Sequence, residues 1–509
     1  MTLAIIYSRA CSGITAPLVT VEAHLSRGLP RFNIVGLPEA AVQESKERVR
    51  SALLNTHFEF PVRRITINLA PADLPKEGGR FDLPIALGIL AATGQIPKNK
   101  LAEYEFTGEL ALSGELRPVR GVLPMVISAK QVNRRLIVPR ANAHEAALVR
   151  SSEVYSASHL LEVCAHLKGE KRLPLCEIEE NEAITVYGLD LEDVRGQMHA
   201  KRALEIAAAG SHSLLFVGPP GTGKTMLASR IPSILPTLTD DYALEVAAIA
   251  SVSNAGFDHL KWQQLPFRSP HHSSSSAALV GGGRPPRPGE ISLAHRGILF
   301  LDELPEFHRN VLESLREPLE SGHITISRAA FQSTFPAKFQ FIAAMNPCPC
   351  GFAGSPTDSC HCTIEQVQRY LRKLSGPLLD RIDMQVEVPS LPPEVLAMNA
   401  EKNSSESSDV VRARVIKARE FQLTRQHKCN AELLPNELTM HCHLEEGAQQ
   451  LLSQMMLKLN FSARVYHRIL KVARTIADLG GVDDILISHI SEALTYRCLD
   501  RVIFKQNPR

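Results

Sequence analysis

One short stretch constrains this chain more than any other: an apolar run, a glycine-rich loop and a helical pattern follow one another directly. Residues 213–217 are Ser-Leu-Leu-Phe-Val, which is typical of a buried strand, and residues 218–225 are Gly-Pro-Pro-Gly-Thr-Gly-Lys-Thr. The apolar positions Met226, Leu227 and Ile231 then predict a helix. This order predicts an α/β protein with a phosphate-binding loop, because glycines let successive backbone N–H groups surround phosphate oxygens.

Lys224 and Thr225 supply the chemistry of this loop. We expect the Lys224 ammonium to reach the β- and γ-phosphates of ATP, and the Thr225 hydroxyl to bind Mg²⁺. A glycine-rich turn without a ligand is the alternative, but the flanking strand and helix favour a nucleotide site. The residues predicted to contact the nucleotide are Gly218, Pro219, Pro220, Gly221, Thr222, Gly223, Lys224 and Thr225.

A second apolar run ends in two acidic residues. Residues 297–301, Gly-Ile-Leu-Phe-Leu, predict a buried strand, and Asp302 and Glu303 follow it directly. We expect Asp302 to join Thr225 in the nucleotide site by holding Mg²⁺, and Glu303 to polarise the attacking water. A surface turn is the alternative. The acidic pair favours hydrolysis of ATP over binding alone.

The composition is that of an ordinary globular protein. Of the 509 residues, 44% are hydrophobic and 22% charged, which excludes a disordered or collagen-like chain. Since the formal net charge is only +2, any nucleic-acid site must be a local basic lining. No window reaches the ~18 consecutive apolar residues of a membrane span. The amino terminus does not resemble a signal peptide, so we expect a cytoplasmic protein without a membrane partner.

The patterning predicts three domains and a linker. Arg64–Ala70 alternates with the period of a half-buried strand, whereas Ser462–Leu479 has the spacing of an amphipathic helix. Further expected elements are strands at 31–35 and 136–138 and helices at 39–56 and 82–92. The expected parts are an α/β unit at 1–167, a charged linker at 168–186, a second α/β unit at 187–390 and a helical region at 391–509.

The order of the motifs carries a family resemblance. Phe339–Met345 is an apolar run that ends at Asn346, and residues 378–383 are Leu-Leu-Asp-Arg-Ile-Asp. With the glycine-rich loop and the acidic pair, these resemble the AAA+ ATPases, most closely the branch of the magnesium-chelatase ATPase subunit and the MCM helicases. The resemblance implies an αβα P-loop core with a helical lid. It makes Asn346 sensor 1, Arg381 the arginine finger and Arg464 sensor 2.

The arginine finger has a consequence for assembly. By this resemblance, Arg381 acts on the γ-phosphate bound by a neighbouring subunit, so the family pattern implies a homo-oligomeric ring, most often a hexamer.

Two insertions between the motifs are candidate DNA contacts. Residues 267–290 are rich in serine, glycine and arginine, which suits a loop that contacts a phosphate backbone. Residues 323–328 and 330–335 are β-prone and predict a hairpin. In the resembling helicases, insertions at these points face the pore and grip DNA. Subunit packing and coupling to the nucleotide remain open alternatives. The candidate DNA-binding residues are Arg268, Arg284, Arg287 and Arg328.

Basic residues also follow the predicted helix 462–479. This basic stripe is typical of a solvated helix face, and only its first member has an expected role; its residues are Arg464, Arg468, Lys471 and Arg474.

Four of the ten cysteines are crowded into one short segment. They form two Cys-x-Cys pairs with nine residues between the pairs. Four thiolates in a glycine- and proline-rich loop could form a structural Zn²⁺ site. Free thiols or redox pairs are the alternatives, since this spacing is tighter than the common Cys-x₂-Cys. The candidate ligands are Cys348, Cys350, Cys360 and Cys362.

The first α/β unit has a resemblance of its own. Lys76–Pro84 and Phe106–Gly121 resemble the proteolytic domain of the Lon family, which implies a ribosomal S5 domain 2-like α+β fold. Arg80 and Leu123 stand where that family carries its nucleophilic serine and its lysine, so the resemblance implies the fold without proteolysis. The polar residues that remain in these segments would then form a binding surface or a contact between subunits. They are Lys76, Arg80, Asp82 and Glu109.

Over nearly its whole length, the chain resembles the bacterial YifB/ComM family. The resemblance implies an ATP-hydrolysing ring that acts on branched, single- and double-stranded DNA. Such a ring drives branch migration of recombination intermediates and aids integration of incoming DNA during natural transformation.

Three alternatives differ in class. One is a metal-chelatase-type ATPase subunit that drives a partner enzyme, which stimulation by that partner and not by DNA would favour. The second is an ATP-dependent protease, against which Arg80 and Leu123 argue. The third is a non-enzymatic scaffold ring, against which the intact motif residues argue: Lys224, Asp302, Glu303 and Arg381.

Overall fold

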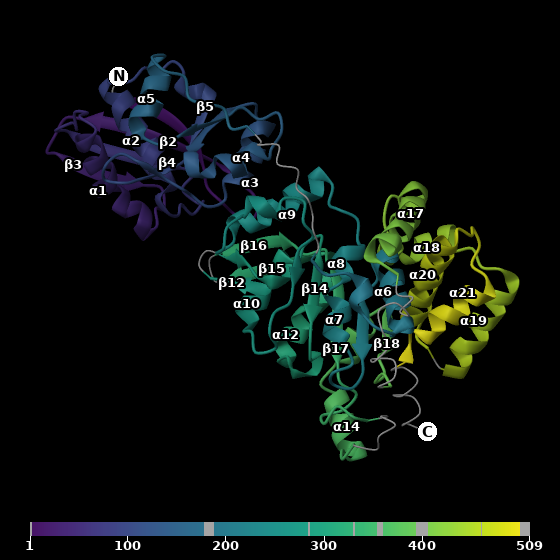
Figure 1. The fold of residues 1–509 in the computed structure, drawn as a ribbon. Helices are drawn as coiled ribbons and strands as arrows, with labels where there is room; N and C mark the ends of the chain where they lie inside the picture. Colours follow the sequence, from purple (N-terminus) through teal and green to yellow (C-terminus); the bar gives the residue numbers. More distant parts are fainter. Residues whose placement is uncertain are drawn as a thin grey trace. The chain divides into compact units, whose positions relative to one another are not determined.

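The chain comprises two compact units (Figure 1). The computed structural model describes residues 3–177, 188–283, 286–328, 331–353, 360–392, 406–459 and 461–498. The first unit extends to residue 183 and includes Asp240–Trp262, and the second contains Ile184–Thr239 and Gln263–Arg509. The sequence placed residues 240–262 in the second α/β unit. The structure groups them with the first because helix α9 (Asp240–Val252) buries Ala247 and Ala248 against α3 (Val122–Gln131).

A seven-stranded mixed sheet forms the centre of the first unit. Its order is β3-β4-β2-β1-β5-β8-β9, with antiparallel pairing of β2 to both β1 and β4 and parallel pairing elsewhere. The strands are β1 (Leu3–Arg9), β2 (Leu18–Ser26), β3 (Arg31–Val35), β4 (Arg64–Ala70), β5 (Tyr104–Phe106), β8 (Arg135–Pro139) and β9 (Val154–Ala157). A two-stranded ribbon is formed by β6 (Glu109–Leu110) and β7 (Leu116–Arg117).

Helix α2 (Asp82–Thr93) is the core helix of this unit. It lies against β1, β2 and α1 (Ala40–Asn55), and its residues 82–91 are all buried. A helix that is apolar all round is stable only inside a core, which explains the position of α2. The remaining helices of the unit are α4 (Ala143–Ala147) and α5 (Leu160–Lys168).

A five-stranded parallel sheet organises the second unit. Its order is β11-β14-β17-β10-β18. The strands are β10 (Leu214–Val217), β11 (Phe267–Arg268), β14 (Ile298–Leu301), β17 (Gln340–Met345) and β18 (Met384–Glu387). Every residue of β10, β14 and β17 is buried, as expected of a parallel sheet covered on both faces.

Short helices and two ribbons surround this sheet. The helices are α6 (Met198–Gly210), α7 (Lys224–Ala228), α8 (Ile231–Ile234), α10 (Ser276–Val280), α11 (Glu290–Leu293), α12 (Arg309–Ser314), α13 (Arg316–Ser321), α14 (Ile364–Leu371) and α15 (Gly376–Leu379). The ribbons are β12 (Gly281–Gly282) with β13 (Arg287–Pro288), and β15 (His323–Arg328) with β16 (Phe331–Pro336). The second ribbon confirms the predicted hairpin.

A helical region completes the second unit, and Figure 1 shows it gathered beside α6. It consists of α17 (Ser408–Gln426), α18 (Pro435–His441), α19 (Glu446–Leu459), α20 (Ala463–Gly480) and α21 (Ile487–Thr495). One apolar core runs from the sheet into this region and joins Phe216 of β10 to Ile469 of α20. Within the described residues, no helix has the length and apolarity needed to cross a membrane.

The basic residues of α20 contradict the expected solvated face. The Arg474 side chain is 2% exposed and forms an ion pair with Asp478. Lys471 donates a hydrogen bond to the Ala431 carbonyl at 3.0 Å, and Arg468 forms an ion pair with Asp383. The prediction was wrong for these three residues because Asp478 on the same helix, Asp383 after the sheet and the Ala431 carbonyl satisfy their charged groups inside the lid.

Candidate nucleotide-binding and hydrolysis site

The sheet order brings the predicted motif residues to one edge. β10, β14 and β17 are parallel, and β17 lies between the other two. The phosphate-binding loop follows β10, Asp302 follows β14 and Asn346 follows β17, so all three begin at carboxyl ends of strands. Open parallel sheets bind ligands at this edge.

Two glycines show why the loop needs its composition. A Cβ atom on Gly218 would lie 2.2 Å from the Val388 carbonyl oxygen, so no larger residue fits there. Gly223 has a φ of 88°, in the left-handed region that favours glycine, and α7 begins at the next residue. The loop therefore turns sharply from β10 into α7 and leaves backbone N–H groups at the turn.

The Lys224 ammonium lies inside the loop. It donates hydrogen bonds to the carbonyls of Gly218 and Pro219, both at 2.7 Å, and to Oδ1 of Asn346 at 3.2 Å. Burial lowers the pKa of Lys224, although the charges of Asp302 and Glu303 act in the opposite direction. A cation held by neutral carbonyls can exchange them for phosphate oxygens at a gain in electrostatic energy.

Thr225 and Asp302 bring two elements into contact. The Thr225 hydroxyl donates a hydrogen bond of 2.5 Å to Oδ2 of Asp302. Both groups are oxygen donors of the kind that Mg²⁺ prefers, so this pair fits the magnesium ion that accompanies ATP.

Glu303 lies beside Asp302 in an unusual backbone conformation. Its φ is 52°, in the left-handed region that non-glycine residues rarely adopt. The Glu303 carboxylate lies 3.0 Å from Nδ1 of His272, in the segment between β11 and α10. Sequence reasoning did not assign His272 a role; its only signal was the His-His pair within the serine-rich insertion.

Arg381, the predicted arginine finger, is held within its own chain. Its side chain is 8% exposed and forms an ion pair with Glu320 of α13. Its Nη1 atom donates a hydrogen bond to the Pro377 carbonyl at 2.6 Å. Arg464, the predicted sensor 2, is exposed in the first turn of α20.

Asp383, two residues after Arg381, forms the junction between the sheet and the lid. It accepts a hydrogen bond from the Ser213 backbone N–H at 3.0 Å and forms an ion pair with Arg468. Burial raises the pKa of this carboxyl, but Arg468 and His212 outweigh burial and hold it well below its usual range. Local sequence patterns predict no role for Asp383, because Ser213 and Arg468 are distant from it in the chain.

The structure describes three of the four candidate DNA-binding residues. Arg268 lies in β11 and forms a bidentate ion pair with Glu290, at 2.6 and 2.7 Å. Arg287 begins β13, and Arg328 ends β15 at the tip of the hairpin. Arg284 lies outside the described residues.

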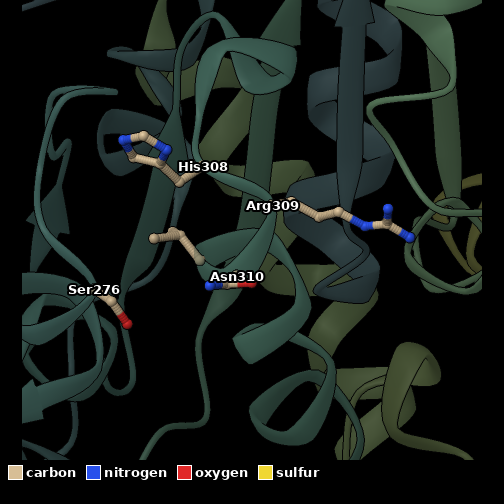
Figure 2. Close-up of a pocket in the computed structure, with 5 residues that line it drawn as sticks. Ser276, His308, Arg309 and Asn310 are labelled. Atoms are coloured by element: carbon tan, nitrogen blue, oxygen red, sulfur yellow. The ribbon is translucent and has the colours of Figure 1, made fainter.

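A pocket of about 370 Å³ lies beside the insertion 267–290. Its lining comes from α10 and from the start of α12, and Figure 2 shows the Arg309 side chain extending away from His308. None of its lining residues belongs to the phosphate-binding loop, and only Ser276 lies in a segment that the sequence singled out. The lining residues are Ser276, His308, Arg309, Asn310 and Val311.

The four predicted cysteine ligands are brought together. The Sγ atom of Cys348 lies 3.3 Å from that of Cys350 and 3.8 Å from that of Cys360. Cys362 completes the group, and all four sulfur atoms lie within 4.8 Å of one another. All four are free thiols, so the cluster could hold a metal ion.

The polar residues singled out in the first unit are largely structural. Asp82 is fully buried, and it accepts hydrogen bonds from Ser45, Arg48 and the Leu110 N–H. Lys76 is also fully buried, and burial lowers its pKa.

The other two residues are partly accessible. Arg80 is half-buried and contacts Cys11, and the Glu109 side chain packs against Gly79.

Comparison with known proteins agrees with this geometry. A family model described as magnesium chelatase, subunit ChlI, matches residues 190–396. Models of subunit ChlI of Mg-chelatase and of the ChlI C-terminal region match residues 21–142 and 405–497.

Similar proteins include full-length relatives. Competence protein ComM of Haemophilus influenzae is 53% identical over 510 residues, which cover 99% of each chain. Protein YifB of Salmonella typhimurium is 51% identical over 506 residues, 99% of this chain and 98% of YifB. The archaeal Lon protease of Pyrococcus abyssi is 40% identical over 70 residues, which are 14% of this chain and 7% of that protein.

Proposed function

The chain belongs to the YifB/ComM family with a ChlI-type AAA+ ATPase core, and we propose that it is a ring-forming motor that uses ATP to drive branch migration of DNA. The observation that carries this proposal is the convergence of Lys224, Thr225, Asp302 and Asn346 at one edge of the parallel sheet. The similarity to a competence protein supports a role in integrating incoming DNA during natural transformation.

In ATP hydrolysis, each residue at the carboxyl edge of the parallel sheet would have its own role. Lys224 would exchange the carbonyls of Gly218 and Pro219 for phosphate oxygens, while Thr225 and Asp302 hold Mg²⁺. Glu303 would accept the proton of the water that attacks the γ-phosphate. The Asn346 amide, whose Oδ1 lies 3.2 Å from the Lys224 ammonium, would help to orient that water.

The ring would complete the site through Arg381 and Arg464. In the isolated chain, Glu320 neutralises Arg381. We propose that assembly exchanges this carboxylate for the γ-phosphate of a neighbour, so that the finger acts only in the ring, expected to be a hexamer. Arg464 would act as sensor 2, since its exposed position in the first turn of α20 leaves the guanidinium accessible to a bound nucleotide.

DNA would contact the two insertions that follow β11 and α13. The hairpin β15–β16 ends at Arg328, and the ribbon β12–β13 includes Arg287. Arg268 would contact phosphate only after releasing Glu290. Repetition of these arginines around a ring would create a basic lining even though the net charge is only +2.

The first unit would serve assembly or binding. The Lon similarity covers only 14% of this chain but supports a Lon-like fold. Arg80 and Leu123 at the positions of the Lon serine and lysine argue against proteolysis.

A ChlI-type ATPase subunit that drives a partner enzyme is the second candidate. It is favoured by the family models, which match three segments of the chain and all describe the chelatase subunit. In that case DNA would not stimulate ATP hydrolysis.

A comparison of DNA structures tests the proposal. ATP hydrolysis and strand displacement by the full chain would be measured with linear, forked and four-way-junction DNA, with Lys224→Ala as the negative control. We expect the greatest stimulation and displacement with branched DNA. An ATPase rate that is the same with and without every DNA would overturn the motor function.

A further inference from the structure

We propose that the four cysteines Cys348, Cys350, Cys360 and Cys362 hold one structural Zn²⁺ ion, which fixes the turn after Asn346 against the phosphate-binding loop. The metal site stands on the cysteine geometry alone, whereas its effect on ATP rests on the proposed function.

The sulfur positions match a single tetrahedral ion. Zinc–sulfur bonds of about 2.3 Å place neighbouring sulfurs of a tetrahedron about 3.8 Å apart. The sulfurs of Cys348, Cys350 and Cys360 are separated by 3.3, 3.6 and 3.8 Å. A disulfide needs about 2.05 Å, so these contacts are not disulfide bonds. Four sulfurs that converge on one point have the arrangement of a ligand shell.

The thiolate ligands indicate which metal ion the site would bind. Four thiolates favour zinc over Mg²⁺ or Ca²⁺, which prefer oxygen donors. Because all four sulfurs lie within 4.8 Å of one another, they fit around one ion and not around the several metals of an iron–sulfur cluster. Four protein ligands leave no open coordination position, which is typical of structural zinc.

Backbone N–H groups stabilise the negative charge of the cysteine sulfur atoms. The Ala353 N–H donates a hydrogen bond to Sγ of Cys348 at 3.3 Å. The sulfur of Cys350 accepts hydrogen bonds from the backbone N–H groups of Phe352 and His361. Hydrogen bonds of this kind stabilise thiolate ligands and fix their direction.

The cluster joins two elements and touches the nucleotide loop. Cys348 follows β17 and Asn346, whereas Cys362 directly precedes Thr363, the N-cap of α14. Between the first two ligands and the rest of the loop lies Gly351, where a Cβ atom would be only 2.7 Å from Cδ of Pro220. An ion bound here would hold the Gly351 turn against Pro220 and keep Asn346 in place.

Metal analysis tests the site directly. The full chain would be purified without chelators and assayed for zinc and iron, beside the double variant Cys360→Ser/Cys362→Ser and the matched control Cys176→Ser. We expect about one zinc per chain in the wild type and the control, and almost none in the double variant. Wild-type zinc below about 0.2 per chain, or iron in its place, would overturn the proposal.

Nucleotide affinity tests the link to the loop. We expect zinc loss to weaken binding of a fluorescent ATP analogue about tenfold, both in the double variant and in wild type stripped by a chelator. Cys362→His should retain zinc and affinity because histidine can replace one thiolate. Stripped wild type that keeps full affinity would overturn the link.

The two proposals fail separately. Zinc content is measured without ATP or DNA, so an inactive motor would leave the metal result standing. A chain that hydrolyses ATP with DNA but contains no zinc would overturn only the metal site.

Discussion

The Thr225 hydroxyl donates a 2.5 Å hydrogen bond to the Asp302 carboxylate, and this contact joins the first turn of α7 to the end of β14. The two residues are 77 positions apart in the sequence, yet they form one oxygen-lined position for a metal ion. Lys224 makes a similar connection to Asn346 after β17. Three neighbouring strands therefore contribute to one site.

Removal of the Lys224 ammonium is expected to abolish nucleotide binding. Lys224→Ala should weaken ATP affinity at least about 100-fold, since it deletes the cation that contacts the phosphates. Lys417→Ala, on the exposed face of α17, is the matched control and should bind normally. Titration with a fluorescent nucleotide measures both. Equal affinity of the two variants would contradict the role of Lys224.

Neutralising Glu303 should separate binding from hydrolysis. Glu303→Gln keeps the shape of the side chain but cannot accept a proton, so kcat should fall by at least about 100-fold. Nucleotide affinity should remain as in the wild type. Phosphate release and nucleotide titration measure the two quantities. Hydrolysis at the wild-type rate would refute Glu303 as the base.

His272 is expected to restrain Glu303 in the absence of DNA. The two side chains lie 3.0 Å apart, and the contact occupies the carboxylate that must accept the proton of water. His272→Ala should raise the ATPase rate measured without DNA about two- to fivefold, which corresponds to the free energy of one partly exposed polar contact. The same variant should be stimulated less by DNA. The neighbouring exposed His271→Ala is the control. A lower rate in His272→Ala would instead make His272 an activating residue.

Arg381 is expected to act on the site of a neighbouring subunit. Arg381→Ala should bind ATP but lose about 10³-fold in kcat. Rings that mix Arg381→Ala with Lys224→Ala chains should regain part of the activity, because some interfaces then combine an intact loop with an intact finger. No recovery in mixed rings, whose formation is verified by mass, would argue that Arg381 acts within its own chain.

Asp383 should stabilise the second unit over the whole neutral pH range. Because its pKa is lowered on folding, its contribution is complete above the unfolded pKa of about 3.9 and is lost as the pH falls below that value. Asp383→Asn leaves Arg468 without its partner and should cost about 3–5 kcal/mol.

Denaturant unfolding of the wild type and of Asp383→Asn at pH 7 and at about pH 3, which is below the unfolded pKa, measures this effect. Glu420→Gln, an exposed change on α17, is the control and should leave stability unchanged. A free energy of unfolding equal to that of the wild type at pH 7 would contradict the structural role of Asp383.

The sequence predicted several strands and helices well, because their side-chain patterns involve residues close together in the chain. The strands at Arg31–Val35 and Arg64–Ala70 have the predicted bounds, and helix α20 differs from its predicted range by one residue at each end. Periodicity of side chains along a strand or helix depends on near neighbours, which is why the sequence contains this information. The glycine-rich loop and the acidic pair are similarly local, since their chemistry is carried by consecutive residues.

The partners of individual side chains were decided by tertiary structure. Three arginines illustrate this point. Arg474 is buried and pairs with Asp478, Arg268 pairs with Glu290, and Arg381 pairs with Glu320 of α13. The partners of Arg268 and Arg381 are acidic residues that folding brings near and that no local period records, whereas Asp478 lies only one helical turn after Arg474.

The sequence by itself therefore determined the element types, the nucleotide-binding motif and the candidate ligands. Only the tertiary structure decided that Asp240–Trp262 joins the first unit, that His272 contacts Glu303 and that four cysteine sulfurs converge. The physical reason is that α9 meets α3, and His272 meets Glu303, only when separate elements pack together. The cysteines share one segment, but their sulfur atoms meet only because that segment folds back on itself.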